Sequence, residues 1–263
     1  LFTLGLCGAD KIFLIGGVQA IALMANGLLG SQKADIIVGP GNQYVAEAKR
    51  QIFGATGIDL LAGPTDVLII ADEEADAELV ATDLVSQAEH GYNSPVWLLT
   101  TSNILAKRVL ELVPEIIEKL PIQNKSNASQ AWRELGEIIL CSTRAEAVKI
   151  ANEIAPEHLH VQATELDWWK GELNSYGSLF LGEETTVAFG DKAAGPNHVL
   201  PTSGAAKYTG GLSVHKFIKV VTWQKAESRS LNRLAEVTAN ISRLEGMEGH
   251  ALSADVRLKK YRK

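Results

Sequence analysis

Short apolar runs alternate with helical patterns along most of this 263-residue chain, and this alternation constrains the fold more than any other feature. Strand–helix alternation predicts an α/β fold with a mainly parallel sheet. The predicted strands are residues 12–15, 36–38, 67–71, 96–100, 138–141, 159–162 and 178–181. The predicted helices are residues 18–28, 44–53, 77–90, 104–120 and 144–154, and residues 121–129 are predicted to be a polar connecting loop.

The pattern changes after residue 212, where the strand signal fades. Residues 225–244 carry a helical pattern, and Gly246 and Gly249 interrupt it just before His250. Flanking glycines disfavour a rigid helical position for this histidine. We therefore expect a helical C-terminal arm that is interrupted just before His250.

Composition and charge exclude several classes of protein. Hydrophobic residues make up 46% and charged residues 21%, which is typical of a globular protein rather than a disordered one. The net charge is −6 without a basic stripe, which argues against a nucleic-acid partner. No apolar run is long enough for a membrane span, and the two cysteines indicate no disulfide framework, so we expect a cytoplasmic protein. Because the chain begins with Leu-Phe-Thr rather than Met, we expect a fragment of a longer protein.

Three loops rich in glycine and proline stand where strands are expected to end: residues 38–42, 62–65 and 190–198. In open α/β sheets ligands bind at the carboxyl ends of strands, and glycines there let the backbone approach a ligand. One such loop alone is as readily an ordinary tight turn, but three together favour a site. No G-x-G-x-x-G sequence occurs in the chain, so a standard dinucleotide-binding loop is not expected.

Gln87 and His90 belong to the pentapeptide Ser-Gln-Ala-Glu-His at residues 86–90, at the end of a helical pattern. Residues three apart project from one helix face. An amide oxygen and an imidazole nitrogen form a pair that zinc accepts. The same spacing also fits two solvated helix residues, so a metal site requires further ligands elsewhere in the chain.

Glu157 and His158 place a carboxylate beside an imidazole. Pro156 ends the preceding helix, so we expect the pair in the turn before the strand at residues 159–162. Neighbours in an extended turn point in different directions, and can therefore supply two acid/base groups to different substrate atoms. An exposed loop pair is the alternative interpretation.

Three other histidines lie in different surroundings. His198 shares a glycine-rich loop with Asp191; the carboxylate offers a hard oxygen ligand, and the imidazole can hydrogen-bond an anionic group. His160 and His215 have no supporting context, and we expect them to be structural or exposed.

These motifs together resemble the histidinol dehydrogenase family. They occur in family order over essentially the whole chain, and their combination is specific to that family. The resemblance covers only the later part of a family chain, and the preceding segment includes part of the cofactor site. The matching stretches are residues 16–20, 38–42, 48–50, 58–64, 86–90, 155–159, 190–191, 195–202 and 245–246, with His250.

The resemblance implies an NAD-dependent and zinc-dependent oxidoreductase of histidine biosynthesis, which oxidises L-histidinol through the aldehyde to L-histidine. It implies two incomplete Rossmann-like units and a homodimer whose C-terminal arm completes the neighbouring site. Residues 1–64 would be part of a cofactor-binding unit, residues 65–212 a second unit with most of the active site, and residues 213–263 the arm.

The resemblance also implies roles for individual residues. The implied general base is His158, and the residue that activates water for the second oxidation is Glu157. The implied zinc ligands are Gln87, His90, Asp191 and His250. The implied substrate contacts are Thr65, His198 and Glu245. The implied cofactor contacts are Gln19 and Asn42.

Some motif variants resemble a paralogous branch, that of sulfopropanediol dehydrogenase. Thr65 and Asp66 stand where the family usually has Ser-Glu, and Lys192 follows Asp191 where an aromatic residue is usual. A lysine there suits an acidic substrate such as a sulfonate, or it is a solvated loop lysine. The alternatives to histidinol oxidation are therefore oxidation of another small alcohol, such as 2,3-dihydroxypropane-1-sulfonate, and a non-catalytic zinc- or ligand-binding fragment.

Overall fold

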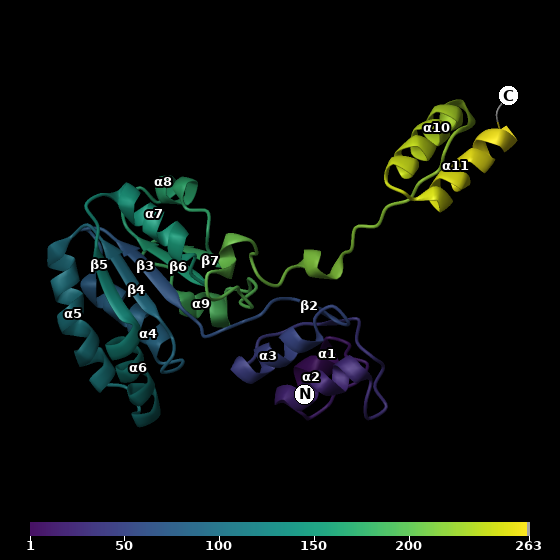
Figure 1. The fold of residues 1–263 in the computed structure, drawn as a ribbon. Helices are drawn as coiled ribbons and strands as arrows, with labels where there is room; N and C mark the ends of the chain where they lie inside the picture. Colours follow the sequence, from purple (N-terminus) through teal and green to yellow (C-terminus); the bar gives the residue numbers. More distant parts are fainter. Residues whose placement is uncertain (262–263) are drawn as a thin grey trace. The chain divides into compact units, whose positions relative to one another are not determined.

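The computed structural model describes residues 1–261, and the chain forms two compact units (Figure 1). The first unit is Leu1–Phe217, and the second begins at Ile218. None of the helices in the described range combines the length and the apolar character that crossing a membrane requires.

A five-stranded parallel sheet forms the centre of the first unit, with strand order β5-β4-β3-β6-β7. In register, Val67 lies beside Val96 on one side and beside His158 on the other. Chain order runs outward from β3 in both directions, which is the doubly wound arrangement. The predicted α/β fold with parallel sheets is confirmed. The strands are β3 (Val67–Ala71), β4 (Val96–Thr100), β5 (Gly136–Leu140), β6 (His158–Gln162) and β7 (Ser178–Leu181).

Helices cover both faces of this sheet. Side chains alternate along β3: Val67 and Ile69 pack toward one helical layer, and Leu68 and Ile70 toward the other. Because both faces are buried, the strand is a continuous apolar run. The first layer consists of α4 (Ala77–Ala88), α5 (Asn103–Glu118) and α6 (Ile122–Leu135), and the second of α7 (Arg144–Ile154) and α8 (Leu166–Glu172).

Side-chain caps fix where the main helices begin. The Asp76 carboxylate accepts hydrogen bonds from the N–H groups of Glu78 and Leu79 at the start of α4. Ser102 and Thr143 cap α5 and α7 in the same way. Such caps satisfy N–H groups that have no partner inside the helix. The fixed start of α4 determines where Gln87, the second-last residue of the helix, is placed.

The N-terminal part of the first unit contains a two-stranded parallel sheet. Its elements are α1 (Phe2–Leu6), α2 (Gly17–Asn26), β1 (Ile36–Ile37), α3 (Gln43–Ile52) and β2 (Gly57–Ile58). The buried Lys49 ammonium pairs with Asp59 and also donates to the carbonyl of Gly39 at 2.9 Å. The Asp59 carboxylate accepts from the Gly39 N–H at 2.7 Å. This ion pair therefore clamps the glycine-proline loop that follows β1.

Two predicted elements are wrong. Residues 12–15 do not form a strand, because no described strand pairs with them, and Leu14 is 84% exposed. Residues 121–129 are not a loop: Pro121 precedes the first turn of α6, where its missing N–H costs nothing. Ala128 and Ala131 of that helix are fully buried, so tertiary packing stabilises a segment that is polar overall.

Helix α9 (Val187–Lys192) and the short 3₁₀ turns η1 (Ala205–Lys207) and η2 (Val214–Phe217) complete the first unit. Helices α8 and α9 are absent from the sequence-based prediction. Both are short, with 7 and 6 residues, and such segments show little periodicity. Asp191 therefore lies on a helix rather than in the glycine-rich loop where the sequence placed it.

Helices α10 (Ser228–Leu244) and α11 (Glu248–Tyr261) form the second unit and confirm the predicted helical arm. The two helices pack through small residues, Ala235 and Ala239 against Ala251 and Ala254. The helical pattern is interrupted after Leu244, where Gly246 has a φ of +73°, as predicted. His250, however, lies in the first turn of α11, so the expectation that it lies outside a helix is wrong. A glycine in a helix costs only about 1 kcal/mol, which this packing offsets.

Candidate functional site

Four of the predicted site residues meet at the amino edge of the five-stranded sheet. Thr65 precedes β3, Glu157 directly precedes β6, and His158 is the first residue of β6. Gln87 lies near the end of α4, which returns toward this edge after starting beyond the carboxyl end of β3. The loop at residues 62–65 therefore precedes a strand, and the expectation that it follows one is wrong.

Gln87, Thr65 and Glu157 form a chain of hydrogen bonds. The Gln87 Nε2 donates to Thr65 Oγ1 at 2.6 Å, and the Thr65 hydroxyl donates to Glu157 Oε2 at 2.5 Å. Gln87 is 2% exposed, so its amide is held in a single orientation. The bond through Nε2 leaves Oε1 as the atom that can ligate a cation, a form of orientation that metal sites commonly use.

His158 is held so that only one of its ring nitrogens can act as a base. Its Nδ1 lies 2.8 Å from the carbonyl oxygen of Asp66, and a carbonyl only accepts, so Nδ1 carries the proton. Nε2 is then unprotonated, and within residues 1–261 this buried atom has no hydrogen-bond partner. Burial lowers the pKa of His158, which keeps the imidazole neutral at pH 7. The site thus contains a preformed proton acceptor.

Asp66 and Glu157 form a buried pair of carboxyl groups, and sequence reasoning did not assign Asp66 to the site. The Glu157 N–H donates to Asp66 Oδ1 at 2.7 Å, and the Asp66 N–H donates to Glu157 Oε2 at 3.2 Å. Burial raises the pKa of Glu157 to about 8 and that of Asp66 to about 7. An acidic residue at the start of an apolar strand was the signal for Asp66.

Three further predicted residues act on His158 electrostatically. The two largest influences on the pKa of His158 are burial, which lowers it, and the bond to Asp66, which raises it. Smaller effects come from Asp191, which raises this pKa, and from His90 and His198, which lower it. Asp191 also contributes to the raised pKa of Glu157, after larger effects of burial and nearby groups. His90 follows α4 in a turn, and its N–H donates to the Gln87 carbonyl at 3.2 Å. These three side chains are exposed or half-buried around the buried pair.

The predicted zinc ligands come from both units. Within the described residues, no group of three or more His, Cys, Asp or Glu side chains is arranged to hold a metal ion. The predicted set contains only two such side chains in the first unit, His90 and Asp191, because Gln87 supplies an amide and His250 lies on α11. The fixed Gln87 amide suits a zinc ion, and the ligand set stays a prediction.

Other predicted contacts lie away from this cluster or on the second unit. Gln19 is exposed on α2, and Asn42 caps α3, accepting from the N–H groups of residues 44 and 45 at 3.1 Å. No hydrogen bond or ion pair among residues 1–261 joins either one to the cluster. Glu245 is exposed at the end of α10. Their assignments to cofactor and substrate stay predictions.

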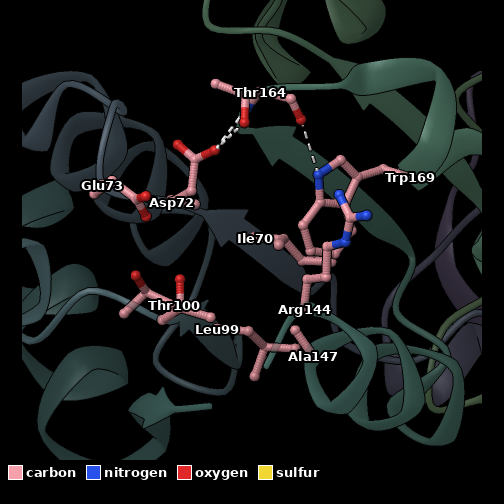
Figure 2. A pocket seen from close by; sticks show the side chains of 11 residues that line it. Ile70, Asp72, Glu73, Leu99, Thr100, Arg144, Ala147, Thr164 and Trp169 are labelled. Atoms are coloured by element: carbon pink, nitrogen blue, oxygen red, sulfur yellow. Dashed lines mark hydrogen bonds between the residues drawn. The ribbon is translucent and has the colours of Figure 1, made fainter. Parts of the chain in front are cut away.

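The carboxyl edge of the sheet, shown in Figure 2, has a different character. A cavity of about 240 Å³ lies there, lined by residues after β3 and β4 and by α7 and α8. Asp72 accepts hydrogen bonds from the N–H and Oγ1 of Thr164, at 2.7 and 2.8 Å. The Trp169 indole donates to the Thr164 carbonyl at 3.1 Å, and Arg144 pairs with Glu165. Much of the polar lining is thus already engaged in internal contacts.

Comparisons with known proteins agree with the motifs. The model of the histidinol dehydrogenase family matches residues 1–258. A histidinol dehydrogenase homolog from Ruegeria pomeroyi is 64% identical over the whole chain, and sulfopropanediol 3-dehydrogenase from the same organism is 62% identical over 97% of it. Histidinol dehydrogenase from Gluconobacter oxydans is 44% identical over 97% of the chain.

A solved structure is also similar. The crystal structure of histidinol dehydrogenase from Elizabethkingia anophelis aligns over the whole chain with a TM-score of 0.88 and 38% sequence identity. This chain covers 60% of that protein, and 59–60% of the three relatives named above. It therefore spans less than two thirds of the length of the proteins it matches.

Proposed function

The chain belongs to the histidinol dehydrogenase family, and we propose that it provides the catalytic groups of an NAD-dependent enzyme that oxidises a small primary alcohol through the aldehyde to the acid. The observation that supports this most directly is the buried, neutral imidazole of His158 with a free lone pair on Nε2. A general base needs this protonation state before it can take a proton from an alcohol.

In the first oxidation, the His158 Nε2 takes the proton of the substrate hydroxyl while hydride leaves the carbon. NAD, when bound, accepts that hydride. The alcohol loses two electrons and two hydrogens and becomes an aldehyde. The bond from Nδ1 to Asp66 stabilises the imidazolium that forms, because a carbonyl acceptor attracts the more acidic N–H of the charged ring.

In the second oxidation, Glu157 takes a proton from water as the water oxygen adds to the aldehyde. The resulting hydrate loses a hydroxyl proton and a hydride, for which a second NAD would be the acceptor, and becomes the acid. Burial raises the pKa of Glu157 to about 8, so the fraction of carboxylate able to act as base increases as the pH rises toward that value. The Thr65 hydroxyl, which donates to Oε2, keeps the carboxyl group oriented.

Zinc fits the remaining donors, with Gln87, His90 and Asp191 from one chain and His250 from the C-terminal arm of a second copy in a homodimer. A zinc ion held there would bind and orient the polar groups of the substrate. The donor set of one amide oxygen, one carboxylate and two imidazoles is consistent with zinc chemistry.

For the substrate, we favour an acidic diol such as 2,3-dihydroxypropane-1-sulfonate over L-histidinol. The chain is 62% identical to a sulfopropanediol 3-dehydrogenase and 44% identical to the Gluconobacter histidinol dehydrogenase. Lys192 is exposed at the end of α9, directly after Asp191, and its ammonium group can pair with a sulfonate. Histidinol has no such anionic group.

The test is NAD reduction by the full-length protein with each of these two substrates. We expect a higher kcat/KM with the sulfonate, and a KM for the sulfonate about 10-fold higher in Lys192→Ala, as expected for loss of about 1.4 kcal/mol of binding energy. Lys207→Ala, which removes an exposed lysine of η1, is the matched control. Faster turnover of histidinol would reverse the substrate assignment, and no NAD reduction with either would contradict the proposed reaction.

Zinc analysis of Gln87→Ala and His250→Ala tests the ligand set. We expect substoichiometric zinc in both variants and normal zinc in Gln162→Ala, which removes another buried glutamine amide. Stoichiometric zinc in both ligand variants would contradict the set. A parent protein that holds zinc and reduces no NAD would instead favour the non-catalytic alternative.

A further inference from the structure

Asp66 contacts both catalytic groups of the proposed mechanism, although it matches no substrate, metal or cofactor position of the motifs. Its carbonyl accepts from His158 Nδ1 at 2.8 Å. Its carboxylate accepts from the Glu157 N–H at 2.7 Å, and its own N–H donates to the Glu157 carboxylate at 3.2 Å. One residue thus holds the backbone and side chain of Glu157 and the ring of His158.

We propose that the side chain of Asp66 is a positioning group, which holds the backbone at Glu157 and so sets the placement of the Glu157 carboxyl group and of the adjoining His158 ring. This inference rests on the proposed function, because the proposed mechanism is what makes these two side chains catalytic. Asp66 itself faces Glu157 and the backbone, so it acts through its neighbours.

The surroundings of Glu157 show why its amide needs a fixed partner. On its other side, the Glu157 carbonyl accepts from the Ser178 N–H at 2.9 Å. A Cβ on Gly177 would lie 2.5 Å from the same carbonyl oxygen, so the backbone there is closely packed. With its N–H held by Asp66 and its carbonyl held by β7, the peptide chain at Glu157 has one arrangement. The position of the Glu157 carboxyl group is therefore restricted as well.

The carboxylate of Asp66 is itself held in place. The backbone of Ser203, in the loop that follows the glycine-rich segment, favours the charged form of this carboxyl group and so counters part of the rise in its pKa. That loop packs closely on residues 62–65: the Gly63 N–H donates to Thr202 Oγ1, and a Cβ on Gly63 would lie 2.8 Å from Ser203 Oγ. The positioning contacts therefore join three segments far apart in the sequence.

Burial of this carboxyl group beside that of Glu157 is an arrangement that stability alone disfavours. Asp66 is 4% exposed and Glu157 is 7% exposed. Two acids in one apolar site suffer desolvation and mutual repulsion, and apolar residues of similar volume usually fold at least as stably. A function in orienting the reactive groups accounts for the pair, and packing alone does not.

Asp72 provides a matched control, because it flanks the same strand at the other end. It directly follows β3 as Asp66 directly precedes it, and it accepts bonds from the segment after β6 as Asp66 does from the segment before it. An alanine at either position removes a carboxylate that connects two strand ends.

The experiment compares Asp66→Ala, Asp66→Asn and Asp72→Ala in the full-length protein. We expect Asp66→Ala to lower kcat about 100-fold with little change in KM, the size of effect that misplacing reactive groups by about 1 Å produces. Asp66→Asn retains an acceptor for the Glu157 N–H and should recover much of this loss. Asp72→Ala should lower the melting temperature without lowering kcat. Equal kcat in Asp66→Ala and the parent would overturn the proposal.

Crystal structures of the same full-length variants separate this inference from the proposed reaction. We expect the Glu157 carboxyl group and the His158 ring to be displaced in Asp66→Ala and unmoved in Asp72→Ala. If the parent oxidises neither substrate, the proposed function fails, and these structures still decide whether Asp66 positions the pair. Unmoved side chains in Asp66→Ala would overturn the positioning role whatever the activity.

Discussion

The two ends of strand β3 carry the same residue in two different settings. Asp66 at the amino edge is buried and shares its site with Glu157, which has a pKa raised to about 8. Asp72 at the carboxyl edge is half-buried, and both of its carboxylate oxygens accept hydrogen bonds from backbone or hydroxyl groups. Within residues 1–261, the amino edge keeps a basic ring nitrogen of His158 without a partner, whereas Asp72 at the carboxyl edge uses both of its carboxylate oxygens to close turns.

This difference places the candidate chemistry opposite to the usual position in a doubly wound sheet. The crevice at the carboxyl ends of the strands is the common ligand site of such folds, and cavities do lie there. The buried carboxyl and imidazole groups with perturbed pKa values nevertheless gather at the amino edge. A fold-level rule indicates where to look, but the state of individual polar groups identifies the reactive site.

The largest expected difference between the two edges of the sheet concerns His158. His158→Asn in the full-length protein should lower kcat for alcohol oxidation by roughly 10²–10⁴, the usual contribution of a general base. The matched control is His160→Asn, which removes another buried imidazole from the same strand. We expect that variant to be less stable and to keep the kcat of its folded fraction. An unchanged rate in His158→Asn would show that His158 at the amino edge is not the general base.

A second test concerns the hydrogen bond that Gln87 donates to Thr65. Thr65→Val keeps the shape of the side chain and removes the hydroxyl that holds the Gln87 amide. We expect zinc affinity to fall roughly 10-fold to 100-fold, as for other residues that orient a metal ligand. Competition with a chelator measures the effect. Thr100→Val, a buried threonine at the carboxyl edge, should leave zinc affinity unchanged.

At the carboxyl edge we expect an effect on stability alone. Asp72→Asn weakens its bonds to the N–H of Glu74 and to the N–H and hydroxyl of Thr164. The free energy of unfolding should fall by about 1–2 kcal/mol, because each such bond contributes about 1 kcal/mol net. Chemical denaturation measures this loss. A drop in kcat in the correctly folded variant would assign chemistry to this edge.

The pH dependence of stability tests the amino edge in a different way. The pKa values of Asp66 and Glu157 rise on folding from 3.8 and 4.5 to about 7 and about 8. The folded state therefore binds more protons than the unfolded state between these limits, and stability falls as the pH rises from about 4.5 to about 8. The slope should be at most about 1.4 kcal/mol per pH unit for each proton.

Chemical denaturation across that pH range measures this slope. Asp66→Asn should reduce it, and Asp66→Asn combined with Glu157→Gln should reduce it further, because neither amide titrates. If the slope is unchanged in the double variant, Asp66 and Glu157 do not cause the pH dependence of stability.

Much of the fold could be predicted because its signals are local. Runs such as residues 67–71 are apolar at every position, as a strand buried on both faces must be. Residues 121–129 were wrongly predicted to be a loop, because Ala128 and Ala131 are buried by contacts with distant residues, which the local sequence does not show. His250 was placed in a broken segment for the same reason, since packing against α10 stabilises its helix.

The candidate site could be predicted only in part. The pairing of Glu157 with His158 is visible as two neighbours after a proline, and the spacing of Gln87 and His90 as a helical pair. Asp66 was missed because its importance comes from Glu157, which is 91 residues away in sequence. An aspartate flanks the apolar run at each end, and the run alone does not show which of the two contacts the acid/base pair.

The sequence by itself determined the strand–helix alternation, the family of the chain and a candidate acid/base pair, because these depend on residue type and short spacing. Only the tertiary structure decided which edge of the sheet holds the candidate groups, which nitrogen of His158 is left unprotonated and which aspartate accepts the hydrogen bond from its other nitrogen. The physical reason is that burial and hydrogen-bond partners set protonation, and parallel strands bring those partners from distant parts of the chain.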